Sequence, residues 1–146
     1  MKKILLRSVI SCCLGLVMLV SATPSAAVDG RDFAGFFELK NVLDQGNVVS
    51  FNFSVRVFNY SDADVIGAYV VLGDSLFLEA YTVFQNVRMD YQGHVFLSGD
   101  TYVPAWEYDQ WQRGGRPNLS VEYQDAAGNP VMRMVELIEM PLGDLS

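Results

Sequence analysis

The chain has 146 residues, of which 51% are hydrophobic and 18% are charged, and its formal net charge is −7. This length suits one domain, since domains are most often about 100–150 residues long. The excess of acidic residues, with no cluster of Lys and Arg interleaved with aromatic residues, argues against a nucleic-acid partner, whose phosphates would repel the protein.

The first 27 residues have the three parts of a secretory signal peptide. A positively charged start is followed by a short apolar run, and small residues then occupy the positions that signal peptidase needs. These parts are Lys2, Lys3 and Arg7, then Ile10 to Val20, then Ser25 to Ala27. We therefore predict a cleaved signal peptide over 1–27 and a single domain over 28–146, with an ordered core at about 34–140.

Two alternatives to this cleavage stay open. An uncleaved anchor is disfavoured because the apolar run is shorter than the roughly 20 residues that a membrane helix needs. Lipidation at Cys12 is disfavoured because almost no apolar segment precedes that cysteine. Either way, we expect a periplasmic or extracellular location, with the membrane involved only through the export signal.

Cleavage changes the chemistry that the rest of the chain has at its disposal. Both cysteines, Cys12 and Cys13, lie in the signal, so the exported chain has no disulfide, no cysteine metal ligand and no cysteine nucleophile. Seven basic and seventeen acidic residues remain, a net charge of −10. This charge favours cations or neutral surfaces over anions as partners.

The first half of the exported chain contains three predicted strands. We assign the first to Phe36–Leu43. Residues 49–57 alternate apolar and polar side chains almost perfectly, which indicates a strand with one buried face. Val65–Leu72 is apolar on both faces, as expected of a central strand.

The second half contains three more predicted strands and one helical turn. The strands are His94–Val103, the alternating segment Leu119–Gln124, and Val131–Met140, which Pro130 opens at a position where its missing N–H costs little. Residues 104–112 break the alternation, and a helical turn that crosses between two sheets fits there.

Turn residues separate these segments at short intervals, and no long helical period or internal repeat is visible. This pattern predicts an all-β fold, an immunoglobulin-like antiparallel two-sheet sandwich of about seven strands with one short helical turn near 104–112.

Two segments resemble a known class of domain. Residues 51–63 form a strand that ends in an Asn-containing turn, and residues 119–129 form a strand followed by a loop of Asp, Gly and Asn. These segments resemble the bacterial immunoglobulin-like sandwich modules of cell-adhesion-related and surface proteins. The resemblance implies a role in binding or assembly.

Acidic turn residues make calcium a candidate ligand, because hard cations prefer clustered oxygens. The candidate ligands are Asp62, Asp64, Asp125 and Asn129. In an immunoglobulin-like sandwich the second-to-third and sixth-to-seventh connections lie at the same end, so these residues are expected to lie near each other. The alternative is that they are ordinary turn residues.

Aromatic residues of the helical turn make a glycan a second candidate ligand. Trp106, Tyr108 and Trp111 would stack on sugar rings, with Arg113 as a nearby hydrogen-bond donor. The alternative is that Tyr108 and Trp111, three residues apart on one helical face, cap the core while Trp106 lies elsewhere.

Catalytic chemistry has little support in this sequence. His94 is the only histidine, no nucleophile motif accompanies it, and the spacing of the acids selects no catalytic pair. We therefore expect a non-enzymatic protein that binds or assembles at the cell surface or in the periplasm. Its partner would be a protein, joined at an edge strand such as Phe36–Leu43 or Val131–Met140, or a surface polysaccharide. A small hydrolase is the less favoured alternative.

Overall fold

The computed structural model describes residues 32–74, 76 and 78–141, so the predicted signal peptide lies outside the described residues. In this part of the chain, no helix combines the length and the apolar character that a membrane span requires. The described elements are β1 (Phe33–Asp44), β2 (Val48–Asn59), β3 (Val65–Gly73), β4 (Ala80–Met89), β5 (His94–Pro104), α2 (Ala105–Gln112), β6 (Asn118–Gln124), β7 (Pro130–Met134) and β8 (Glu136–Glu139).

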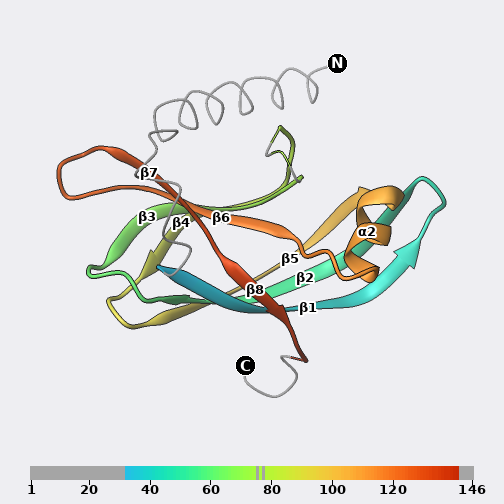
Figure 1. The fold of residues 1–146 in the computed structure, drawn as a ribbon, viewed down its shortest axis with the longest axis horizontal. Helices are drawn as coiled ribbons and strands as arrows, with labels where there is room; N and C mark the ends of the chain where they lie inside the picture. Colours follow the sequence, from blue (N-terminus) through green and yellow to red (C-terminus); the bar gives the residue numbers. More distant parts are fainter. Residues whose placement is uncertain (1–31, 75, 77, 142–146) are drawn as a thin grey trace.

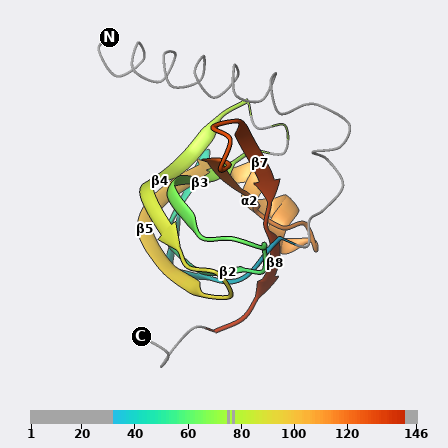
Figure 2. The ribbon, with the colours of Figure 1, turned by 90° about the vertical axis from the view of Figure 1, so that its left-hand side faces the viewer.

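The strands form two four-stranded sheets. Sheet A has the order β5-β2-β1-β8 and sheet B the order β4-β3-β6-β7; Figure 1 shows β1 and β2 below β3 and β6, and the end-on view in Figure 2 shows the strands surrounding a common interior. In sheet A, β1, β2 and β5 correspond to strands A, B and E of immunoglobulin domains. In sheet B, β3, β6 and β7 correspond to strands C, F and G. The predicted all-β sandwich is therefore confirmed, and α2 connects the two sheets as expected.

The core is built around β2. This strand pairs along its length with β1 on one side and β5 on the other. Its inward apolar side chains are at most 3% exposed, and they are Val49, Phe51, Phe53, Val55 and Val57. The alternation that predicted the strand therefore places one side of β2 in the interior and leaves the other on the outer face of sheet A.

β4 has no counterpart among the strands assigned from the sequence, because two backbone irregularities break its alternation. Asn86 has a φ of 54°, and the pairing with β3 shifts register on the way along the strand. The residues that pack inward are consequently unevenly spaced, and they are Tyr81, Phe84, Val87 and Met89. A bulge of this kind changes which face a side chain occupies, so no period of two survives in the sequence.

The predicted last strand, Val131–Met140, is two strands that belong to different sheets. β7 pairs antiparallel with β6, the chain crosses at the buried Val135, and β8 pairs parallel with β1. The crossing segment packs closely on β1 at Gly35, where an added Cβ would lie 2.8 Å from the Arg56 carbonyl oxygen and 3.1 Å from Leu137 Cδ2. A side chain at position 35 would therefore collide with the backbone of β2 and press against the strand crossing.

β1 also begins earlier than the predicted Phe36. Phe33 is fully buried, and its ring meets Tyr123 edge to face at a centroid distance of 6.1 Å. This contact links the start of sheet A to the end of β6 in sheet B, so the core extends to the first described strand residue.

We expect Gly35→Ala to destabilise the protein by about 1–3 kcal/mol, because the methyl group must displace backbone and packed side chains. Gly99→Ala is the matched control, since an added Cβ there would meet only Phe84, at an ordinary 3.5 Å. Urea unfolding of both variants measures the difference. Equal stability of the two variants would contradict the close packing at the crossing.

Candidate functional site

The aromatic residues of α2 do not share one surface. Trp111 is 7% exposed and its ring lies 5.9 Å from that of Phe51, while Tyr108 lies 6.3 Å from the same ring. Trp106 is 54% exposed. The alternative in which Tyr108 and Trp111 cap the core and Trp106 lies elsewhere matches this arrangement, and the remaining candidate, Arg113, is an exposed residue at the end of the helix.

Glu107 is an unforeseen buried acid on the same helix. It is 2% exposed, its Oε1 accepts a hydrogen bond of 3.2 Å from Trp111 Nε1, and within the described structure its Oε2 is buried without a partner. Burial, with a smaller contribution from Asp74, raises the pKa of Glu107 above its ordinary 4.5, against the opposing effect of the Trp111 bond. Burial and then the charge of Glu107 likewise raise the pKa of Tyr81. This helix end therefore carries a carboxyl group that the fold favours in its neutral form.

Two of the acidic turn residues accept hydrogen bonds from backbone N–H groups of turns, Asp125 within its own turn and Asp64 from the neighbouring β4–β5 turn. Asp125 Oδ1 accepts hydrogen bonds from the backbone N–H groups of Asn129 and Ala127. These bonds lower the pKa of Asp125, and the bond from Asn129 has the largest effect. Asp64 Oδ1 accepts the N–H of Tyr91 at 2.7 Å.

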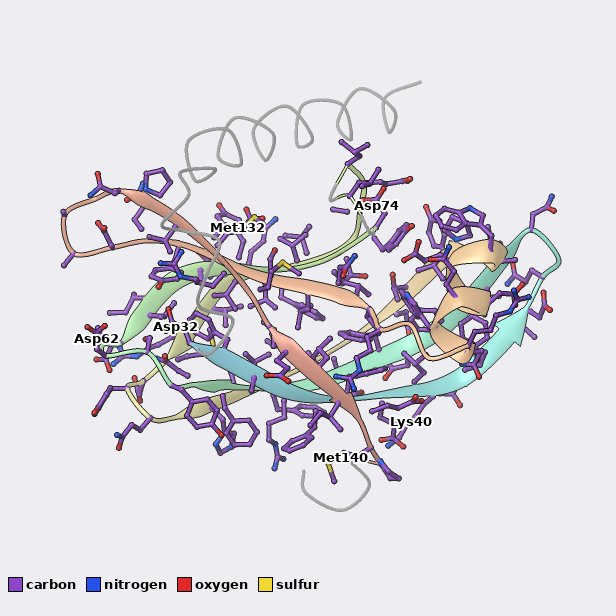
Figure 3. All side chains as sticks on the ribbon, in the orientation of Figure 1. Asp32, Lys40, Asp62, Asp74, Met132 and Met140 are labelled. Atoms are coloured by element: carbon purple, nitrogen blue, oxygen red, sulfur yellow. The ribbon has the colours of Figure 1, made fainter. Side chains whose placement is uncertain are left out.

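Asp62 is exposed, and it is labelled in Figure 3. Over residues 32–74, 76 and 78–141, no three His, Cys, Asp or Glu side chains form a group that could hold a metal. The calcium site at Asp62, Asp64, Asp125 and Asn129 stays a prediction from the sequence.

The outer face of sheet A carries a cluster of aromatic residues that the sequence analysis missed. Its centre is Phe58, whose ring lies 5.4 Å from the ring of His94, 5.9 Å from Phe36 and 6.1 Å from Tyr60, with which it is stacked. In the next cross-strand row, Arg56 lies between Phe36 and Phe96. We call this surface the aromatic face, and it consists of Phe36, Arg56, Phe58, Tyr60, His94 and Phe96.

The aromatic face is open to solvent over much of its area. Tyr60 is 60% exposed and Phe96 44%, and His94 is also exposed, whereas Phe36 and Phe58 are half-buried beneath them. His94 therefore contributes a ring to this surface. Contiguous exposed apolar area of this kind marks binding surfaces more often than isolated apolar residues do.

A row of small polar side chains continues the same face along β2 and β5. Asn52 Oδ1 accepts hydrogen bonds from the hydroxyls of Ser54, at 3.0 Å, and Ser98, at 3.1 Å, and Asn52 Nδ2 donates to Asp100. We call Asn52, Ser54, Ser98 and Asp100 the polar ladder. From Asn52 to Phe58 the combined surface runs about 20 Å along the strand, with one side chain every two residues.

Chemically, this surface combines aromatic rings with hydroxyl, amide and carboxylate groups on one regular sheet. Lys40, beside Asn52 in the register and 3.2 Å from Glu38, belongs to the same side of sheet A and is labelled there in Figure 3. The sequence contained a signal for the aromatic face. Phe58 and Tyr60 continue the outward positions of the Val49–Val57 alternation, where polar residues were expected.

The two strands proposed as assembly edges differ in position. β1 lies inside sheet A, since Ala34 to Phe37 pair with β8 while the strand also pairs with β2. The expectation that Phe36–Leu43 forms an edge is therefore wrong for its first residues. Val131–Met140 does supply edges, because β7 ends sheet B and β8 ends sheet A.

Fold and surface together define a small immunoglobulin-like sandwich with an exposed aromatic sheet face. No protein-family model matches the chain, and no curated protein matches it. Among solved structures, it is similar to the X-ray structure of Northeast Structural Genomics Consortium target SoR45, with 7% sequence identity and a TM-score of 0.40 over 75% of this chain and 85% of the other.

The unequal burial of the two tryptophans predicts unequal fluorescence quenching. In Trp106→Phe the remaining Trp111 should emit at shorter wavelength and resist acrylamide, whereas in Trp111→Phe the remaining Trp106 should be quenched readily. Steady-state quenching of both variants, folded and in denaturant, measures this. Equal quenching of the folded variants would contradict the placement of Trp111 under the helix.

Glu107→Gln should stabilise the protein at neutral pH. Because the folded-state pKa of Glu107 is raised, wild-type stability falls as pH rises from about 4.5 through that folded pKa. The variant lacks this loss, and its Oε1 can keep the Trp111 bond. Urea unfolding from pH 3 to pH 8 should show that the free energy of unfolding of the variant exceeds that of the wild type only above the unfolded-state pKa of Glu107.

Asp109→Asn, an exposed acid on the same helix, is the control for the change in net charge. An equal gain in both variants would attribute the effect to overall charge, and it would contradict a specific cost of burying Glu107.

Proposed function

We propose that the protein is a small exported, non-enzymatic sandwich that binds neutral polysaccharide at the cell surface or in the periplasm, through the aromatic face and the polar ladder. The observation that carries this proposal is the cross-strand register, which aligns Phe36, Arg56 and Phe96 in one row and the polar pairs in the rows beside it.

The chemistry of a sugar chain supports this choice of ligand. A pyranose ring has apolar C–H faces that pack on aromatic rings, and its hydroxyl edges hydrogen-bond to amides, hydroxyls and carboxylates. The aromatic face supplies the first kind of contact and the polar ladder the second, and they adjoin on one sheet surface. Rigid strands hold the groups at fixed spacing, which limits the entropy lost on binding.

The negative charge of the protein restricts the class of glycan that it can bind. The exported chain carries a net charge of −10, Asp100 belongs to the proposed surface, and Glu38 lies beside Ser54 in the register. Polyanionic glycans would be repelled at this charge, so the proposal is for a neutral glycan. This surface replaces Trp106, Tyr108, Trp111 and Arg113 as the proposed glycan site, because two of those aromatic rings pack on Phe51.

Phe96→Ala and Tyr60→Ala should each weaken binding of a neutral hexasaccharide. Loss of one stacked ring should remove about 1.5 kcal/mol, roughly tenfold in Kd. The probes are β-1,4-linked hexamers of glucose and of N-acetylglucosamine, measured by calorimetry and by the rise in melting temperature. Both residues are exposed, so the variants should fold normally.

Trp106→Ala is the matched control, since Trp106 is an equally exposed aromatic residue on α2. Its affinity should equal that of the wild type. Loss of binding in this variant alone would move the site to the helix. Absence of binding to either hexamer would contradict the glycan proposal.

A further inference from the structure

A cavity opens on the outer face of sheet B, the sheet opposite the aromatic face. It has a volume of about 270 Å³, and its lining residues are Ile66, Gly67, Tyr69, Glu122, Tyr123, Gln124 and Pro130. We call it the Glu122 pocket. Met132, the cross-strand partner of Glu122, is labelled on this side of the molecule in Figure 3.

The pocket lies where two paired strands part. β3 and β6 are paired from Gly73 with Asn118 as far as Tyr69 with Glu122, and their ladder ends there. Next to this point Gly67 has a φ of +66°, and the register of β3 shifts between Val65 and Ala68. The bulge turns this part of β3 away from its regular register, and the space beside the last residues of β6 is the cavity.

A buried carboxylate lines this cavity. Glu122 is 3% exposed, and the hydroxyl of Ser120 donates to its Oε1 over a long 3.4 Å. Burial raises the pKa of Glu122, with the Ser120 bond opposing it, and no Lys or Arg side chain among the described residues contributes to the shift.

Among the described residues, none of those that line the pocket is a Lys or an Arg. Tyr69 and Met132 flank it across the strands, and Gln124 follows on its own strand. The nearest cation along β7, Arg133, is paired in register with the inward Val121 and lies 3.2 Å from Asp32. Its charge acts on Tyr123 but does not contribute to the pKa shift of Glu122.

We infer that the Glu122 pocket binds an alkylammonium group, with the Glu122 carboxylate as its counter-ion and the ring of Tyr69 at its rim. A buried carboxylate without a charged partner costs free energy, and a cation entering the cavity would offset that cost. Aromatic rings attract cations through their faces, and Tyr69, which lines the cavity, is 46% exposed.

The size of the cavity points to a small ligand group. Sites for drug-sized ligands usually enclose about 300–1,000 Å³, and this cavity lies just below that range. A single alkylammonium arm suits it, whether from a free amine or from a lysine side chain of a partner. The net charge of −10 on the exported chain would attract either one.

The test is titration of the purified protein with n-butylamine at pH 7.5, followed by two-dimensional NMR, with n-butanol as the neutral isostere. We expect the amine to shift resonances around Glu122 and Tyr69 and the alcohol to shift none. Glu122→Gln should weaken amine binding about tenfold or more, since it removes a charge-assisted hydrogen bond. Glu136→Gln, an exposed acid on β8, should leave it unchanged.

The pH dependence gives a second readout. Amine affinity should fall as pH drops through the folded-state pKa of Glu122, because the protonated carboxyl no longer attracts a cation. Glu122→Gln should show no such fall. If it fails to fold, Tyr69→Leu supplies the comparison, with several-fold weaker amine binding expected.

Two further arms complete the test. Blocked lysine, with both backbone groups capped, should bind like butylamine if the natural source is a side chain, and should be rejected if it is a free amine. Equal shifts with amine and alcohol, or amine binding unaffected by Glu122→Gln, would overturn the inference. Phe96→Ala should keep amine binding, so failure of the glycan proposal leaves this one standing.

Discussion

Burial of one side of β2 is the constraint on which the rest of this molecule depends. β2 is paired on both edges, so its backbone is satisfied and its orientation is fixed by which side chains enter the core. Phe53, Val55 and Val57 are fully buried against sheet B. A slip of one residue would expose them and bury Arg56 instead, at a cost of many kcal/mol, so the register has a single solution.

That same constraint creates the aromatic face. Because side chains alternate, fixing the inward set of β2 also fixes the outward set, and the partners in β1 and β5 follow from the ladder. Phe58 and Phe96 are held by the burial of residues on the other side of the same strands. The positions of these rings are therefore set by packing on the opposite side of the same strands, as the proposed binding site would require.

Two buried glutamates, Glu107 and Glu122, differ in what surrounds their carboxyl groups. Glu107 and Glu122 are both nearly inaccessible, and burial is the main cause of the raised pKa of each. Glu107 accepts a hydrogen bond from Trp111 within the packed end of the sandwich, and its burial is a cost of packing the helix there. Glu122 lines a cavity where two strands part, and this position is the basis of the proposed amine site.

The sequence by itself determined the elements with unbroken local periods: β2 and β6 by alternation, α2 by its interruption, and the sandwich by their number and spacing. It also carried the outward aromatic positions of Phe58 and Tyr60. Only the tertiary structure decided the bulged β4, the crossing at Val135, the row that joins Arg56 to Phe96, and the parting of β3 and β6. The physical reason is the distance along the chain over which the determining contacts act. Alternation depends on neighbours two residues apart, whereas register, bulges and sheet switching depend on burial shared between segments distant in the chain.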